Sequence, residues 1–231
     1  MTHSDIYTKF MIEYDKADVT SSYPSLTKYE VATILDKAYL ALIAQKLTGN
    51  NPRKVSFEAD VKSAEDLRPL VVNKEVSPTK STIYKNEYTY TLPDNFMYYV
   101  QALVKISGDD LALVKFKNHD EVRMYKYTDT NYPWISHPIA YPEDKGLNII
   151  FDADCADNGT TKTLVLTYIK EPNKFVKGSG KLTTDYDFGT TTFQLSDSMA
   201  EELINLAIIM STEIVESSRL TTKINTRPLE S

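Results

Sequence analysis

Three carboxylates ahead of an Asn-Gly pair form the run of residues best suited to chemistry. Asp152, Asp154 and Asp157 alternate with small residues and precede Asn158 and Gly159. Alternating oxygen donors before a glycine are typical of calcium-binding loops. However, an alanine stands where a third ligand would fall, and no glutamate closes the loop. Asn-Gly is also the strongest short-range hairpin signal, so we favour an acidic hairpin loop over a calcium site.

The histidines and the single cysteine have neither the spacing of metal ligands nor that of a catalytic pair. His3, His119 and His137 are scattered, and no two of them lie four residues apart as ligands on one helix face would. Cys155 stands among carboxylates, which disfavour the reactive thiolate. Phosphate-binding and nucleophile-elbow motifs are also missing. The sequence therefore predicts no catalytic residue, no metal, no cofactor and no enzymatic activity.

The single tryptophan lies in the run Tyr132-Pro133-Trp134. Its ring could stack on a sugar or a nucleic-acid base. A tryptophan held by a proline in a loop is more often an anchor in packing or in an interface. We favour the interface role for Trp134, and a monomeric glycan- or ligand-binding module remains the alternative.

The C-terminal helix, expected over residues 197–218, has an unusually wide apolar surface. Ser198 and Glu201 predict a capping box at its start. At about 100° per residue, its apolar residues form two adjacent stripes that cover about 200°, more than one core face requires. The first stripe, assigned to the core, contains Met199, Leu203, Leu206, Ala207, Met210 and Ile214, and the second contains Ala200, Ile204, Ile208 and Val215.

The opposite face of this helix is polar except for Ile209. Its polar members are Glu201, Asn205, Thr212, Glu213 and Glu216. In one interpretation, the helix is central in a bundle and Ile209 is an incidental exposed residue. In the other, the helix packs on its own domain and on a neighbouring subunit. The second interpretation makes these residues candidates for an interface: Ile204, Ile208, Ile209, Val215, Arg219 and, from the loop, Trp134.

Composition and charge limit the possible partners and compartments. The chain has 231 residues and a formal net charge of −6, which does not suit general binding to nucleic acid. A single cysteine excludes an intramolecular disulfide. The first residues do not form a signal peptide, and the apolar runs at 38–44 and 203–210 are far shorter than a membrane span. We expect a chain that is made and folded in the cytoplasm without a membrane partner.

Helical patterns at both chain ends and strand patterns between them predict an α+β fold. Thr27 and Glu30 form a capping box for a helix that ends near Gly49. Residues 100–106 and 111–116 predict one β-hairpin, and residues 147–151 and 163–169 predict a second. We expect helices from the two ends to pack as a small bundle, with a mostly antiparallel β region inserted between them.

The same patterns give a domain organisation. Residues 1–25 are predicted to be an extended N-terminal arm, and residues 220–231 a polar C-terminal tail. Both arms are polar and cannot offset their ordering entropy alone, so we expect them to become ordered only in an assembly. Residues 26–219 are predicted to be a single α+β domain, with its helical part at 26–75 and 196–219 and its β part at 84–176.

The order of these parts resembles a known family. A capped N-terminal helix is followed by a strand after the run Tyr90–Phe96, the Tyr-Pro-Trp loop, a strand at Val165–Pro172, and a helix after Phe193–Asp197. This order resembles the head-to-tail connector, or adaptor ring, proteins of short-tailed bacteriophages, of the tail tubular protein A type. Within that group it is most similar to the ring proteins of crAss-like phages. The resemblance covers about residues 26–219 and is one of pattern, without an invariant motif.

The resemblance implies a non-enzymatic structural virion protein. Such proteins form twelve-fold rings below the portal protein, continue the DNA channel and receive the tail. The implied partners are other copies of the chain, the portal, other tail or ring proteins, and genomic DNA that passes without sequence-specific binding. The implied location is the portal vertex and tail of the virion, after synthesis in the host bacterial cytoplasm. The candidate interface residues would then face another subunit or the portal.

Overall fold

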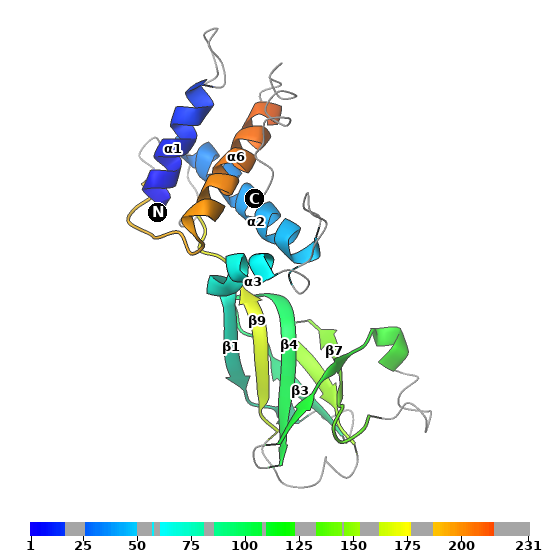
Figure 1. Cartoon of the computed structure of the whole chain (residues 1–231). Helices are drawn as coiled ribbons and strands as arrows, with labels where there is room; N and C mark the ends of the chain where they lie inside the picture. The colour runs from blue at the N-terminus through cyan, green and yellow to red at the C-terminus, as the bar shows by residue number, and fades with distance from the viewer. Residues whose placement is uncertain are drawn as a thin grey trace. The chain divides into compact units, whose positions relative to one another are not determined.

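The computed structural model (Figure 1) divides the chain into two compact units. A helical unit combines residues 1–70 with 172–231, and a β unit comprises residues 71–171. The α+β class, with helices from both ends and a mostly antiparallel β region between them, is confirmed. The two units replace the single domain expected from 26 to 219. The structure describes residues 1–16, 26–49, 57, 61–80, 86–107, 110–122, 133–144, 146–152, 162–176 and 187–214.

The helical unit is built around two helices whose starts are fixed by local hydrogen bonds. At the start of α2, Thr27 Oγ1 accepts from the Glu30 N–H, and the Glu30 carboxylate accepts from the Thr27 N–H. Gly49 ends α2 with a φ of 73°, where the absence of a Cβ removes the steric penalty. The described helices are α1 (His3–Lys16), α2 (Lys28–Thr48), α3 (Val61–Leu67), the 3-10 turn Arg68–Leu70 and α6 (Asp197–Ile214).

Helix α6 begins where expected, but its cap differs from the predicted one. Ser196 Oγ accepts a hydrogen bond from the Met199 N–H at 3.3 Å. The capping side chain is therefore Ser196 and not Ser198, because the N-cap hydroxyl must reach a backbone N–H in the first turn.

The predicted extended arm is wrong over residues 3–16, where the chain forms α1. Ile6, Phe10 and Tyr14 follow one another at intervals of four residues and are at most 1% exposed. This spacing places them on one face of the helix, which packs against α6. Burial of three large apolar side chains offsets the entropy of ordering the segment. Residues 17–25 of the predicted arm, and the predicted tail at 220–231, lie outside the described residues.

Asp36 of α2 anchors the segment where the chain re-enters the helical unit. Its two carboxylate oxygens accept from the backbone N–H groups of Phe175 and Val176, at 2.7 and 3.1 Å. Burial raises the pKa of Asp36, and these two hydrogen bonds oppose that rise. Beside this contact, the Phe175 ring stacks on His3 of α1, so the re-entry segment contacts both helices.

The β unit consists of two sheets whose edge strands follow one another in the chain. One sheet has the order β1-β9-β4-β5 and the other has the order β2-β3-β8-β7-β6. The chain runs from β1 directly into β2, and from β5 directly into β6, so it turns the corner between the sheets on both sides. The strands are β1 (Val71–Val76), β2 (Thr79–Lys80), β3 (Glu87–Thr91), β4 (Phe96–Ser107), β5 (Asp110–Leu113), β6 (Lys115–Phe116), β7 (Ile139–Glu143), β8 (Gly146–Ile150) and β9 (Leu164–Lys170).

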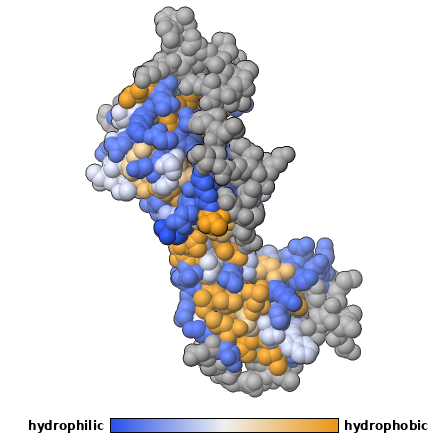
Figure 2. Space-filling model, viewed as in Figure 1, coloured by the Kyte–Doolittle hydropathy of each residue, from blue (hydrophilic) through white to orange (hydrophobic). Residues whose placement is uncertain are grey.

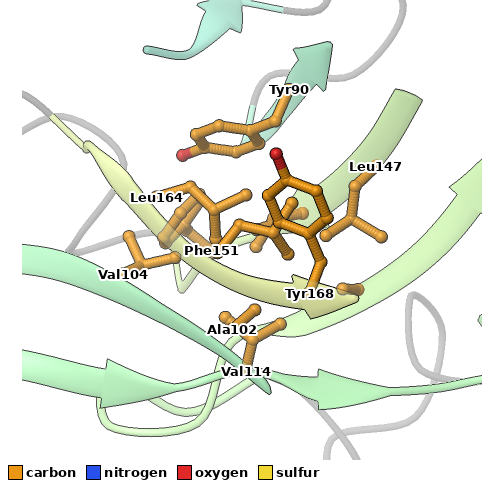
Figure 3. Packing of buried hydrophobic residues seen from close by; sticks show 11 residues of the cluster. Tyr90, Ala102, Val104, Val114, Leu147, Phe151, Leu164 and Tyr168 are labelled. Carbon is orange, nitrogen blue, oxygen red and sulfur yellow. The ribbon is translucent and has the colours of Figure 1, made fainter. Parts of the chain in front are cut away.

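The space between the two sheets is filled by side chains (Figure 3). The rings of Tyr90, Phe151 and Tyr168 lie among aliphatic residues from both sheets and are at most 2% exposed. The Tyr90 hydroxyl donates to the Lys162 carbonyl at 2.7 Å, and the Tyr168 hydroxyl donates to Asn95 Oδ1 at 2.9 Å. The two tyrosines therefore bury their rings without leaving a hydroxyl unpaired.

One predicted hairpin is confirmed and the other is wrong. Strands β4 and β5 pair antiparallel, with Leu103 opposite Leu113. Strands β8 and β9 do not pair, because β8 lies between β3 and β7 in one sheet and β9 lies between β1 and β4 in the other. The Asn-Gly signal requires a tight connection between the strands, whereas residues 151–163 separate these two. That connection is long enough to cross between sheets.

Candidate assembly surfaces

The wide apolar surface of α6 is largely satisfied inside the helical unit. Ile204 and Ile208 are each 1% exposed, so their assignment to an interface is wrong. Helix α6 packs against both α1 and α2, and two helical neighbours require a wider apolar arc than one. Thr212, expected on the polar face, is also buried, and its hydroxyl donates to the Ile209 carbonyl at 2.9 Å.

The remaining predictions for residues of this helix have different outcomes. Ile209 is half-buried. Ile214, assigned to the core stripe, is 62% exposed at the end of α6, so that assignment is wrong. The core assignment is confirmed for Leu203, which is fully buried. Val215 and Arg219 lie outside the described residues.

Trp134 lies on the surface of the β unit. It is 71% exposed, and the neighbouring Ile135 is 44% exposed. The turn that carries them is closed by a hydrogen bond from the His137 N–H to the Trp134 carbonyl at 2.9 Å. A large exposed aromatic side chain on a hydrogen-bonded turn is accessible to a partner, so Trp134 remains a candidate interface residue.

A further apolar surface lies on the outer face of the four-stranded sheet. Ala102, Val104 and Ala112 point into the core, so the residues that alternate with them point outward. We call four of these outward residues the sheet-face cluster: Leu103, Leu111, Leu113 and Val165. Leu111 and Leu113 are 52% and 45% exposed, and the other two are half-buried.

The strand register makes the sheet-face cluster continuous. Leu103 of β4 lies opposite Leu113 of β5 on one side and opposite Val165 of β9 on the other. Leu111 is two residues from Leu113 along β5, so it lies on the same face. In Figure 2, hydrophobic side chains gather on the β unit over β1, β9 and β4. Contiguous exposed apolar residues of this kind make the sheet-face cluster a candidate interaction surface.

Charged side chains border the sheet-face cluster. The Lys105 ammonium and the Glu75 carboxylate form an ion pair at 2.8 Å, and the register places Lys105 opposite Leu111 and Glu75 opposite Val165. An apolar centre with a charged border is the usual anatomy of a protein–protein contact.

The residues considered for metal or catalytic chemistry lie apart from these surfaces. His3 stacks on Phe175 in the helical unit, and His119 and His137 contact different residues in the β unit. Of the run considered for calcium, Asp152 is described, and residues 153–161 lie outside the described residues. Across the part of the chain that the structure describes, no three His, Cys, Asp or Glu side chains are placed to hold a metal ion.

A buried tyrosine–carboxylate pair joins two strands of the β unit. The Tyr141 hydroxyl on β7 donates to the Glu87 carboxylate on β3, and Glu87 is 2% exposed. Burial, and then the bond to Glu87, raises the pKa of Tyr141 well above its ordinary value. The phenol therefore stays protonated, and its hydrogen bond joins the two strands that flank β8. A phenol that stays protonated does not suit the role of a general base.

A buried charge triad joins three helices of the helical unit. The Lys46 side chain is 2% exposed, and its ammonium lies 3.1 Å from Asp66 Oδ2 and 3.2 Å from Glu202 Oε2. Lys46 belongs to α2, Asp66 to α3 and Glu202 to α6. Since a buried charge is tolerated only when it is paired, this triad fixes the helices relative to one another.

Comparisons with known protein families and with curated proteins give no match to this chain. Among the described helices, none is both long and apolar enough to cross a membrane. The sequence patterns missed the sheet-face cluster, because its residues come from three strands that only the strand order brings together.

Proposed function

We propose that this chain is a structural, non-enzymatic subunit of the ring that joins the head of a short-tailed bacteriophage to its tail. Copies of the chain would form a twelve-fold ring at the portal vertex and continue the DNA channel. The order of sequence elements supports this assignment through its resemblance to the connector proteins. Like charge supports the passage of DNA without binding, because the chain carries a formal net charge of −6.

The sheet-face cluster is the observation that carries the assembly part of the proposal. The β unit already has a filled core (Figure 3), so Leu111 and Leu113 are not needed to complete it. When a partner covers large, half-exposed aliphatic side chains, the free energy of the complex falls by about 25 cal/mol for each Å² of apolar surface removed from water. In the proposed ring, the main contact therefore lies on the β unit and not on the apolar stripes of α6.

Leu113→Asp is expected to weaken self-association by roughly 10- to 100-fold, while the monomer stays folded. A carboxylate in a covered aliphatic contact costs about 1–3 kcal/mol, but Leu113 is 45% exposed in the single chain. Leu40→Asp is the matched control, since Leu40 is a 40% exposed leucine on α2. Sedimentation velocity across a concentration series measures both variants. Equal association by the Leu113 variant and the wild-type chain would remove the sheet face from the contact.

Exposure of Trp134 favours a second candidate function, a monomeric module that binds a glycan or another ligand. An exposed aromatic ring can stack on the apolar face of a sugar. Because Trp134 is the only tryptophan, its fluorescence reports directly on this site. Saturable changes on titration with oligosaccharides, in a chain that stays monomeric, would favour the module over the ring subunit.

A further inference from the structure

Four side chains with oxygen atoms gather on the outer face of the five-stranded sheet. Asn148 of β8 lies opposite Tyr141 of β7 on one side and opposite Thr89 of β3 on the other. Glu143 and Glu87 are each two residues from one of these partners along their strands, so they lie on the same face. The residues that alternate with them fill the core between the two sheets. We call Glu87, Tyr141, Glu143 and Asn148 the oxygen cluster.

Hydrogen bonds connect the oxygen cluster from one carboxylate to the other. The Tyr141 hydroxyl donates to the Glu87 carboxylate, and Asn148 Nδ2 donates to the Glu143 carboxylate. The Tyr141 hydroxyl also forms a hydrogen bond with the Asn148 side chain. Since each hydrogen bond spans about 3 Å, three in succession keep the two carboxylates within roughly 9 Å of each other. The four side chains therefore converge on one small region.

Two members of the oxygen cluster lack the partner that their burial requires. Asn148 is 4% exposed, and among the described residues none donates a hydrogen bond to its Oδ1. Glu87 is 2% exposed, and within the described part of the chain its carboxylate forms no ion pair. Buried acceptors are normally hydrogen-bonded, and buried carboxylates are normally paired with a cation or coordinate a metal. Glu143 adds a second carboxylate and is exposed, which opens the cluster to solvent.

We propose that the oxygen cluster binds a divalent cation of the calcium type through Asn148 Oδ1 and the carboxylates of Glu87 and Glu143. Oxygen donors select hard cations, and calcium accepts irregular geometry and completes its coordination with water. A half-turn of the Asn148 amide exchanges its nitrogen and oxygen, so that Oδ1 faces Glu143 where Nδ2 now donates. The ion supplies the positive charge that the two carboxylates require. This site goes beyond the proposed function and does not depend on it.

The composition of the site limits its affinity. Only two of its side chains are acidic, which is consistent with the absence, across the described residues, of three His, Cys, Asp or Glu side chains placed to hold a metal. Calcium affinity falls as the number of charged ligands falls, and weak protein sites have a Kd of about 10⁻⁴–10⁻³ M. We expect an affinity in that range for the oxygen cluster.

Titration of the full-length chain with calcium chloride, followed by calorimetry, tests the site. Glu143→Gln should weaken calcium binding by roughly tenfold or more, because it removes one of the two charged ligands. Glu143 is exposed, so this variant is expected to fold as the wild-type chain does. Glu75→Gln is the matched control, since Glu75 is an exposed glutamate on another strand of the same unit. It should leave calcium binding unchanged, and circular dichroism confirms that both variants are folded.

Each outcome decides for or against the oxygen cluster. Saturable binding that Glu143→Gln weakens and Glu75→Gln does not supports the site. Absence of binding at up to about 10 mM calcium, well above the expected Kd, overturns it. Binding that survives Glu143→Gln but is lost with Asp154→Asn also overturns it, because the ion then lies in the acidic run at residues 152–157. Sedimentation of the same samples measures assembly separately, so failure of this site leaves the proposed ring unaffected.

Discussion

Leu203→Asp is expected to abolish cooperative folding of the helical unit. Leu203 is fully buried in α6, which packs against α1 and α2. Loss of a buried leucine costs about 2–5 kcal/mol, and an unpaired buried carboxylate adds several more. The total approaches the 5–15 kcal/mol that stabilises a typical domain. Far-ultraviolet circular dichroism during heating should show reduced helicity and no sharp transition.

A matched control on the same helix separates burial from helix propensity. Ile214 is 62% exposed, so Ile214→Asp should change the free energy of unfolding by no more than about 0.5 kcal/mol. Ile209 is half-buried, and Ile209→Asp should fall between the two. A wild-type melting curve for Leu203→Asp would contradict the position of α6 at the centre of the helical unit.

Lys46→Ala is expected to reduce the free energy of unfolding by about 3–5 kcal/mol, the usual cost of breaking a buried ion pair. The substitution leaves the Asp66 and Glu202 carboxylates side by side without the ammonium that lies within 3.2 Å of both. Denaturant unfolding followed by circular dichroism measures the change.

Two comparisons show whether the loss arises from buried charge. Arg68→Ala breaks an ion pair with Glu65 in which both side chains are more than half exposed, so it should cost only about 0–1 kcal/mol. Combining Lys46→Met with Asp66→Asn and Glu202→Gln removes all three charges and should recover much of the lost stability. If the triad contributes little to stability, Lys46→Ala and Arg68→Ala should reduce the free energy of unfolding by similarly small amounts.

Local signals predicted both ends of α2, the start of α6 and one hairpin. Thr27, Glu30 and Gly49 act through hydrogen bonds and φ angles within a few residues, so their types suffice to place α2. Helix α1 was not predicted, because residues 1–25 taken together are polar and rich in tyrosine, threonine and serine. Ile6, Phe10 and Tyr14 do lie four residues apart, which is the signal that identifies it.

Partners that are distant in sequence could not be predicted in the same way. Strands β8 and β9 have equally apolar patterns, but their sheets are decided by competition among all the strands of the unit. The wide apolar arc predicted for α6 is present, and residues of both stripes are buried. Whether its second stripe meets a helix of the same chain or another copy depends on α1, which was predicted to be an arm. Ile204 and Ile208 were therefore assigned to an interface although they are core residues.

The candidate surface shows the same limit. Trp134 could be selected from its residue type and its loop, and it is exposed. The sheet-face cluster could not be selected, because its four residues come from three strands. Only the order β9-β4-β5 brings Val165, Leu103 and Leu113 into one row.

The central claim is tested most directly by measuring the mass of the full-length chain, alone and with its candidate portal protein, and imaging the same samples by negative-stain microscopy. The proposed ring subunit should form a complex with a mass near twelve copies of the chain, visible as a ring coaxial with the portal. A chain that stays monomeric at every concentration, and does not bind the portal, would contradict the account.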